Sequence, residues 1–221
     1  MGVGSIYNAI SPRFRRRRFE RFVDYVQPKP TDRILDVGGY PGTWSEHDPV
    51  AGSIDMLNTH EADEFDPEEF PDHQMSYRVG DGCALDDVSD GEYDIVFSNS
   101  VIEHVGDWEK QKAFASEMLR VGKKVWIQTP NYHFPIEPHA LSLGLHWLPR
   151  DTQMKVFKWI SLWPHLQRGQ ATEENIRKYV YDIWLLKKSQ MEELFPGCEI
   201  LHERVAGTLT KSFVAARKSN S

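Results

Sequence analysis

The fold is decided by one stretch of the sequence, RILDVGGYPG at residues 33–42. Its first five residues form a short, mostly apolar segment, which is typical of a buried strand, and two glycines follow at once. Pro41 follows them after one further residue, Tyr40, at a place where the first turn of a helix accepts a proline. The stretch therefore predicts a strand that ends in a glycine turn and leads into a helix.

Further short apolar segments follow this strand along the chain. They occupy residues 53–57, 75–79, 93–97 and 124–128. Amphipathic helices are expected before and between them, over 5–26 and 107–121. Strands that alternate with helices and loops are typical of a parallel sheet with crossover helices on its faces.

The alternation stops after residue 131 and resumes near residue 187. The segment 132–186 contains four of the seven tryptophans, Trp147, Trp159, Trp163 and Trp184. Helices are expected near 140–147, 151–163 and 171–182, so the segment is interpreted as an inserted cap whose own core the tryptophans form. An aromatic ligand pocket is the alternative role for these side chains. A last helix over 190–195 and two strands over 199–205 and 210–216 follow, and the short connection between the strands predicts an antiparallel hairpin.

Charge is distributed unevenly along the 221 residues. The net charge is −7, but residues 1–30 alone carry +5, with an arginine run from Arg15 to Arg18, and residues 55–94 hold fourteen carboxylates against Arg78. This charge distribution argues against nucleic acid as a partner, because most of the surface would repel phosphate. The arginine helix is expected to bind an anionic substrate, a membrane surface or a partner, or to pair with the acidic region 55–94.

Cysteine content and hydropathy indicate the kind of compartment. Two cysteines, Cys83 and Cys198, are typical of a reduced, cytoplasmic protein. No apolar run has the ~18 residues that a membrane-spanning helix needs.

Polar or glycine clusters follow four of the expected strands in succession. They are at 36–42, 55–56, 80–82 and 98–100. Ligands of doubly wound sheets bind beyond the carboxyl ends of the strands, so the four clusters predict one shared binding crevice.

This series of strand ends resembles a class I S-adenosylmethionine-dependent methyltransferase of the small-molecule kind called type 11. The resemblance covers residues 33–131 and the closing elements 187–216. It implies an α/β, Rossmann-like fold with a seven-stranded, mostly parallel sheet, a C-terminal antiparallel hairpin and a helical cap. We therefore expect a single domain with a basic helix (1–30), a cofactor-binding core (31–131), the cap (132–186) and the closing elements (187–221).

The resemblance also implies a set of cofactor-binding residues. Asp36, Gly38, Gly39 and Gly42 would form the loop at the amino acid end of the cofactor, and Asp55, followed by Met56, would accept the ribose hydroxyls. Asp81 would accept the adenine amino group, with the backbone of Gly82 and Cys83 beside the ring, and the Asn99 carbonyl would accept the cofactor ammonium. Asp55 lies 19 residues after Asp36, close to the ~20 expected for a ribose acid.

One position departs from the family pattern. Tyr40 stands where the family usually has glycine, so either Gly39 takes over the special backbone conformation or Tyr40 packs on the cofactor. A nicotinamide enzyme is the competing interpretation, but it requires Gly-x-Gly-x-x-Gly, which residues 38–42 do not supply.

Candidate catalytic residues lie after the fourth and fifth strands. His104 follows the fourth strand, and His133, Glu137 and His139 follow the fifth, where a transferred methyl group should face. His139 is the first candidate for a base, with structural hydrogen bonding as the alternative role. We predict no metal site, because prolines interrupt His133, Glu137 and His139 and their spacing is not that of ligands on one helix face.

The expected activity is methyl transfer to oxygen or nitrogen of a small-molecule, sugar or lipid-linked acceptor, with S-adenosylhomocysteine as the product. The turn after the fourth strand lacks the Asn/Asp-Pro-Pro-aromatic pattern of methylases that act on nucleic-acid amines. A subunit that binds cofactor without catalysis, and an RNA methyltransferase that uses the arginine helix, are the alternatives.

Overall fold

The computed structural model describes residues 3–61, 65–166, 172–205 and 207–218. Its centre is a seven-stranded sheet with the strand order β3-β2-β1-β4-β5-β9-β8. The strands are β1 (Arg33–Val37), β2 (Ser53–Asn58), β3 (Met75–Val79), β4 (Tyr93–Asn99), β5 (Gly122–Pro130), β8 (Glu199–Val205) and β9 (Leu209–Arg217). The five strands expected from residue 33 to residue 131 all form, and they run parallel to one another.

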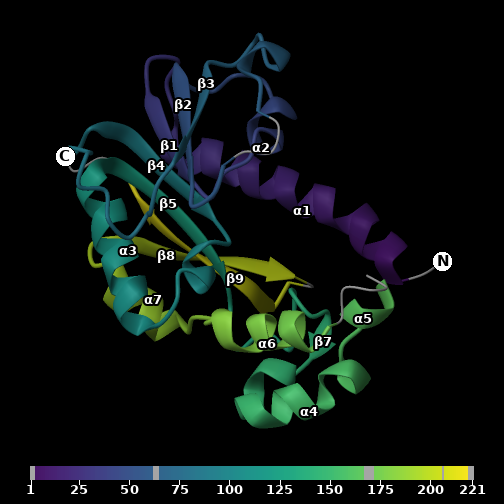
Figure 1. Ribbon diagram of the computed structural model, residues 1–221. Coiled ribbons are helices and arrows are strands. Elements are labelled where there is room, and N and C mark those ends of the chain that lie inside the picture. Colours follow the sequence, from purple (N-terminus) through teal and green to yellow (C-terminus); the bar gives the residue numbers. More distant parts are fainter. Residues whose placement is uncertain (1–2, 62–64, 167–171, 206, 219–221) are drawn as a thin grey trace.

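The closing hairpin also forms as expected. β9 pairs antiparallel with β5 on one side and with β8 on the other, and so it lies between them. The fold is therefore the Rossmann-like, seven-stranded sheet that the sequence predicts, with its antiparallel hairpin at one edge (Figure 1).

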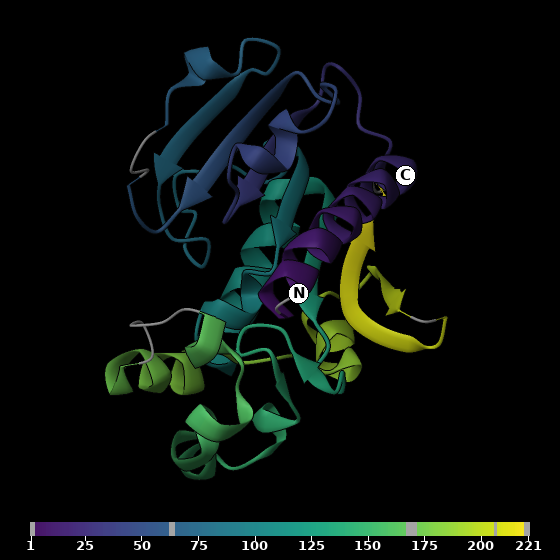
Figure 2. The ribbon, with the colours of Figure 1, turned by 90° about the vertical axis from the view of Figure 1, so that its right-hand side faces the viewer.

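Helix α1 (Val3–Val26) packs on one face of the sheet. Figure 2 shows it in front of the sheet, beside the hairpin of β8 and β9. Phe19 and Phe22 are buried there, and Phe22 meets the rings of Phe97 and Trp126 edge-on at centroid distances of 5.0 and 5.8 Å. The apolar stripe of this helix thus covers one face of the sheet. Side chains at every second strand position, such as Ile34, point toward that face.

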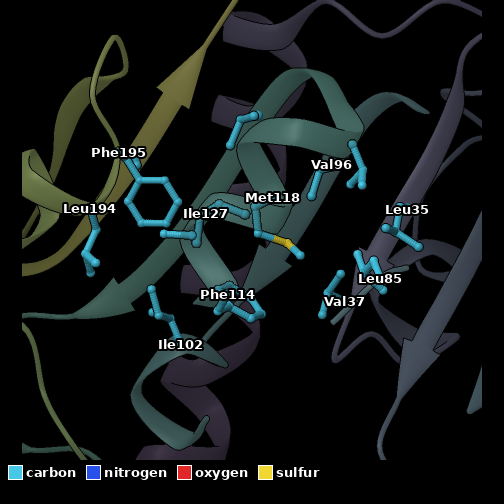
Figure 3. Close-up of a cluster of buried hydrophobic side chains, with 14 of the residues drawn as sticks. Leu35, Val37, Leu85, Val96, Ile102, Phe114, Met118, Ile127, Leu194 and Phe195 are labelled. Carbon is cyan, nitrogen blue, oxygen red and sulfur yellow. The ribbon is translucent and has the colours of Figure 1, made fainter. Parts of the chain in front are cut away.

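Helices α3 (Trp108–Val121) and α7 (Lys188–Leu194) cover the other face. Asp107 caps α3 by accepting a hydrogen bond from the Lys110 backbone N–H at 3.1 Å. Figure 3 shows Phe114 and Met118 of α3 between Val37 and Ile127 of the sheet. Burial of these apolar side chains on both faces holds the carboxyl ends of the central strands in fixed positions.

Two arginines of the basic helix α1 form ion pairs that the sequence did not indicate. Arg18 forms a two-bond ion pair with Glu203 of β8 at 2.8 Å, and Arg16 pairs with Glu20 in the same helix. The predicted pairing with the acidic region 55–94 is wrong for these two arginines. None of the described helices is long and apolar enough to cross a membrane.

The cap differs from the prediction in its details. It contains a small hairpin of β6 (Ile136–Glu137) and β7 (Ser142–Leu143), the helices α4 (Arg150–Ile160), α5 (Trp163–Leu166) and α6 (Glu173–Asp182), and the 3-10 turn η3 (Leu145–Trp147). In the connections between strands of the main sheet there are three short helical segments, α2 (Gly42–Ser45), η1 (Pro67–Glu69) and η2 (Ile102–His104).

The predicted tryptophan core of the cap is wrong. Trp147, Trp159 and Trp184 are 47%, 87% and 39% exposed, and Trp163 only packs against the margin of the cap core. Smaller apolar side chains form that core instead, namely Ala140, Leu145, Phe157, Ile176 and Val180. Aliphatic and phenyl side chains fill so small a volume without the buried hydrogen-bond donor that each indole carries.

Candidate active site

The glycine turn after β1 is built for close approach of backbone. Gly38 has a φ of +78°, and a Cβ there would lie 2.3 Å from Val101. A Cβ on Gly39 would lie 2.0 Å from a carboxylate oxygen of Asp36, whereas a Cβ on Gly42 would meet nothing within 4 Å. Gly38 therefore takes the left-handed conformation, Gly39 is required for space, and the surface above Gly42 is open.

Asp36 supports this turn from beneath. Its side chain is buried and accepts a 2.7 Å hydrogen bond from Trp44 Nε1. Burial raises the pKa of this carboxyl to about 7, although the bond from Trp44 acts in the opposite direction. Asp36 thus acts on the crevice through the shape of the turn.

Asp55 does not lie at the end of β2, where the sequence predicts it. β2 continues beyond it to Asn58, and Asp55 lies in mid-strand opposite Leu35. Its carboxylate accepts from Arg33, from Ser76 at 2.7 Å and from Tyr93 at 2.9 Å. These bonds hold it at the sheet surface, away from the carboxyl edge where a ribose acid must lie.

Met56 is also wrongly predicted, because it is fully buried in the core beneath α1. The residue at the carboxyl end of β2 is Asn58. Its Nδ2 donates to the Gly39 carbonyl at 2.9 Å, and its own carbonyl accepts from the Gly80 N–H at 2.8 Å. Asn58 therefore joins the ends of β1, β2 and β3, and it is the polar side chain that the sequence analysis missed.

The predicted adenine segment follows β3 as expected. The Asp81 side chain is half exposed and accepts a hydrogen bond from the Cys83 N–H at 2.9 Å. Gly82 is required by the core, because a Cβ there would lie 2.9 Å from Val37 and 3.1 Å from Phe114. Burial, the Asp81 charge and its hydrogen bond raise the pKa of the Cys83 thiol to about 11, so it is not a nucleophile near neutral pH.

Asn99 ends β4 beside the glycine turn. Its side-chain oxygen accepts a 2.6 Å hydrogen bond from Arg18, which fixes the side chain from α1. A cavity of about 300 Å³ lies here, and its lining includes Arg18, Tyr40, Gly42 and Asn99. Tyr40 is 57% exposed, so its ring borders this cavity without being held in the core.

Two histidines that lie far apart in the sequence meet above the ends of β4 and β5. His104 Nε2 lies 3.0 Å from His139 Nε2, and His139 Nδ1 lies 2.6 Å from Glu137 Oε1. Glu137 is buried and also accepts from the Ala140 N–H and the Tyr179 hydroxyl. Glu137 therefore sets the orientation of the His139 ring and stabilises a positive charge on it.

The charges of this cluster shift its pKa values in opposite directions. Burial lowers the pKa of His139, but the hydrogen bond and charge of Glu137 outweigh burial, so the net shift is upward. Although His104 as a whole residue is exposed, its ring packs against His139, and the resulting desolvation together with the charge of His139 lowers the pKa of His104 to about 4. Burial also disfavours the charged form of Glu137, yet its bonds to His139 and Tyr179 bring its pKa below the usual value.

Glu103, which precedes His104 in η2, is a further member of the cluster. It is fully buried, and its Oε2 accepts from the Thr129 hydroxyl at 2.9 Å. Its Oε1 lies 3.9 Å from His139 Nε2 and has no hydrogen-bond partner among the described residues. Burial raises the pKa of this carboxyl.

His133 lies outside the cluster. Its side chain is exposed, and its backbone N–H donates to Asn131 Oδ1 at 2.9 Å. A second cavity of about 260 Å³ lies on the cap side, lined among others by Tyr132, Glu137, Tyr179 and Trp184. The cap thus offers a space of small-molecule size that reaches the same Glu137 that orients His139.

A family model described as a methyltransferase domain matches residues 11–167 of the chain. The chain belongs to this methyltransferase family. The match includes the glycine turn, the ends of β2, β3 and β4, and the histidine cluster, and it excludes the nicotinamide interpretation.

Solved structures resemble this chain along most of its length. An S-adenosylmethionine-dependent methyltransferase from Methanosarcina mazei is 13% identical, with a TM-score of 0.51 over 87% of this chain and 95% of that chain. The PH0226 protein from Pyrococcus horikoshii is 15% identical, with a TM-score of 0.54 over 93% and 91%. A Rhodobacter sphaeroides protein whose name assigns it provisionally to the Zn-dependent alcohol dehydrogenases has a TM-score of 0.58 at 12% identity, over 91% and 94%. At these identities the likeness shows the fold alone.

A curated relative from Mycobacterium tuberculosis strain H37Rv is an uncharacterized protein. It is 24% identical over 137 residues, which are 52% of this methyltransferase and 46% of the relative. The chain thus spans about half the length of that protein.

The residues at the strand ends fit the cofactor of an S-adenosylmethionine-dependent methyltransferase. The space above Gly42 is open, and Asn58 and Asp81 offer oxygen acceptors at adjacent strand ends. A positively charged nucleoside with a ribose diol requires such acceptors. A glycine turn without a Cβ at Gly38 and Gly39 leaves room for the amino acid end.

Proposed function

We propose that this methyltransferase transfers a methyl group from S-adenosylmethionine to oxygen or nitrogen of a small-molecule, sugar or lipid-linked acceptor. The observation that carries the proposal is the position of the histidine cluster. One of its members, His104, follows β4, the strand whose end borders the cofactor crevice at Asn99. Another, Glu137, also lines the cap cavity.

The cofactor-binding role is assigned to the strand ends. The glycine turn at Gly38 and Gly39 and the Asn99 backbone would hold the amino acid end. Asn58 would accept the ribose hydroxyls in place of Asp55, and Asp81 would accept the adenine amino group. When bound, S-adenosylmethionine supplies a methyl group on a sulfonium, which the acceptor's lone pair displaces in line.

The acceptor role is assigned to the cap cavity and the cluster. The aromatic rings of Tyr132 and Trp184 border the cavity, and this composition suits a compact ligand with an apolar part. Glu137 holds the His139 ring in one orientation and also lines the cap cavity. We therefore assign to this cluster the acceptor group that loses a proton.

Paired substitutions in β2 test the cofactor site. Asn58→Ala should weaken calorimetric binding of S-adenosylmethionine about tenfold, the equivalent of about 1.4 kcal/mol for one hydrogen bond. Asp55→Asn, which can keep hydrogen bonds to its neighbours, should bind the cofactor like the parent. Weaker binding by Asp55→Asn together with unchanged binding by Asn58→Ala would indicate that Asp55 binds the ribose, and it would refute the assignment to Asn58.

Turnover tests the activity itself. Formation of S-adenosylhomocysteine should depend on one member of a panel of hydroxyl and amine acceptors. Tight cofactor binding without turnover on any acceptor would favour a subunit that binds cofactor without catalysis.

A further inference from the structure

The strongest unexplained feature is the centre of the histidine cluster. Glu103 Oε1, His104 Nε2 and His139 Nε2 all lie within 4.8 Å of one another. They come from the segment after β4 and from the loop after β6, which are brought together only by the fold. All three atoms are good metal ligands once the imidazoles are neutral.

Hydrogen-bond geometry leaves lone pairs directed at this centre. His139 Nδ1 is engaged with the Glu137 carboxylate at 2.6 Å, so in the neutral form of the ring Nδ1 carries the proton and Nε2 carries the lone pair. That lone pair faces His104 Nε2 at 3.0 Å. Two ring nitrogens at this distance are either joined by one shared proton or held by a common cation.

Glu103 provides a second, independent observation. Its side chain is fully buried, Oε2 is bonded to Thr129, and Oε1 has no partner among the described residues while lying 3.9 Å from His139 Nε2. A buried carboxylate oxygen without a donor is costly, and a bound cation would satisfy it. Metal–ligand bonds of about 2.0–2.2 Å place neighbouring ligand atoms about 3–4 Å apart. The distances from His139 Nε2 to His104 Nε2 (3.0 Å) and to Glu103 Oε1 (3.9 Å) lie in this range, and binding would draw together all three atoms, which lie within 4.8 Å of one another.

The surrounding residues support a metal-binding interpretation. Metal-bound histidines commonly donate their second ring N–H to a carboxylate, as His139 does to Glu137. Glu137 is itself held by the Ala140 N–H and the Tyr179 hydroxyl. This buried network fixes the ligand before any ion binds.

We propose that Glu103, His104 and His139 bind one divalent first-row transition-metal ion whose open position faces the methyl acceptor. The site is new relative to the sequence analysis, which predicted no metal site and considered a different set of ligands. The role of the ion in catalysis rests on the proposed function, whereas its binding does not. Two imidazoles and one carboxylate leave at least one position open, as in catalytic zinc sites.

The ion would act on an acceptor hydroxyl. A metal-bound hydroxyl loses its proton to water more readily than a free one. Its oxygen then forms the bond to the methyl carbon while the carbon–sulfur bond breaks and its electron pair remains on sulfur. The products are a methyl ether and S-adenosylhomocysteine, and the acceptor class is an alcohol or phenol.

Titration of the full chain with Co²⁺ alone tests the site. After removal of metals by chelation, calorimetry and metal analysis after dialysis should show one equivalent bound by the parent. Glu103→Gln and His104→Ala should each weaken binding at least tenfold. Glu103→Gln removes a buried charge and keeps the shape of the side chain, and His104 is exposed, so both variants are expected to fold, which circular dichroism checks.

Two further variants distinguish binding of Co²⁺ at the proposed site from weak binding of Co²⁺ by any exposed histidine. His133→Ala, an exposed histidine outside the cluster, should bind Co²⁺ like the parent. Glu137→Gln should weaken binding about 10–100-fold, because it acts only through the orientation of His139. Binding below one-fifth of an equivalent by the parent, or equal binding by the Glu103 and His104 variants, would overturn the proposal.

Calorimetry with S-adenosylmethionine on the same samples keeps the two proposals distinct. Cofactor binding without Co²⁺ binding would refute the metal site and leave the methyltransferase assignment intact. Co²⁺ binding without cofactor binding would support the metal site and refute the proposed cofactor residues.

Discussion

The buried carboxyl of Asp36 should make the stability of the protein depend on pH in an unusual direction. The side chain is 1% exposed, and its pKa is raised from 3.8 to about 7. The native state thus keeps a proton that the unfolded chain has already released above pH 4. Stability from this group is fully present below the unfolded pKa and is lost as pH rises through the folded one.

The size of the effect follows from the shift. About three pKa units at 1.36 kcal/mol each give about 4 kcal/mol in total. About a third of this is already lost at pH 5, so about 2–3 kcal/mol should be lost between pH 5 and pH 8. Asp36→Asn removes the titration but keeps an oxygen that accepts from Trp44 Nε1.

Urea unfolding at pH 5 and pH 8 without added cofactor measures the effect. Asp36→Asn should gain about 2–3 kcal/mol relative to the parent on going from pH 5 to pH 8, while Asp86→Asn, an exposed aspartate, should gain nothing. The comparison with the parent cancels the other titrating groups. An equal difference at both pH values would refute the argument that burial keeps Asp36 protonated.

Three further substitutions test the packing and the site. Phe22→Ala should lower the free energy of unfolding by about 3–5 kcal/mol, because the ring is fully buried between α1 and the sheet; urea unfolding measures it, and a loss below 1 kcal/mol would contradict the burial. Gly39→Ala should weaken calorimetric binding of S-adenosylmethionine at least tenfold, because its Cβ would lie 2.0 Å from a buried carboxylate oxygen; unchanged affinity would mean that the turn adapts. Tyr179→Phe should cost about 1–3 kcal/mol of stability by removing a donor from buried Glu137, whereas Tyr181→Phe, whose exposed hydroxyl bond is at the surface, should cost under about 0.5 kcal/mol; equal costs would argue against a structural role for the bond to Glu137.

Several features of the cofactor crevice could be predicted from the sequence. The apolar strand before Gly38, and the polar or glycine clusters after successive strands, indicate a parallel sheet with a ligand edge. These signals are local, because a strand and the turn that ends it are adjacent in the chain. The position of the end of β2 is the exception. The sequence predicts that end at Asp55, but backbone pairing with β1 and β3 continues the strand beyond Asp55 and leaves Asn58 at the edge.

By itself, the sequence determined the α/β sheet, the glycine turn and the region in which catalytic groups would gather. Only the tertiary structure decided which of those groups meet. His104 and His139 are 35 residues apart, and Arg18 and Glu203 are 185 apart, yet each pair is in contact. The physical reason is that burial and hydrogen bonding of whole elements fix such contacts, and no local pattern of residue types carries that information.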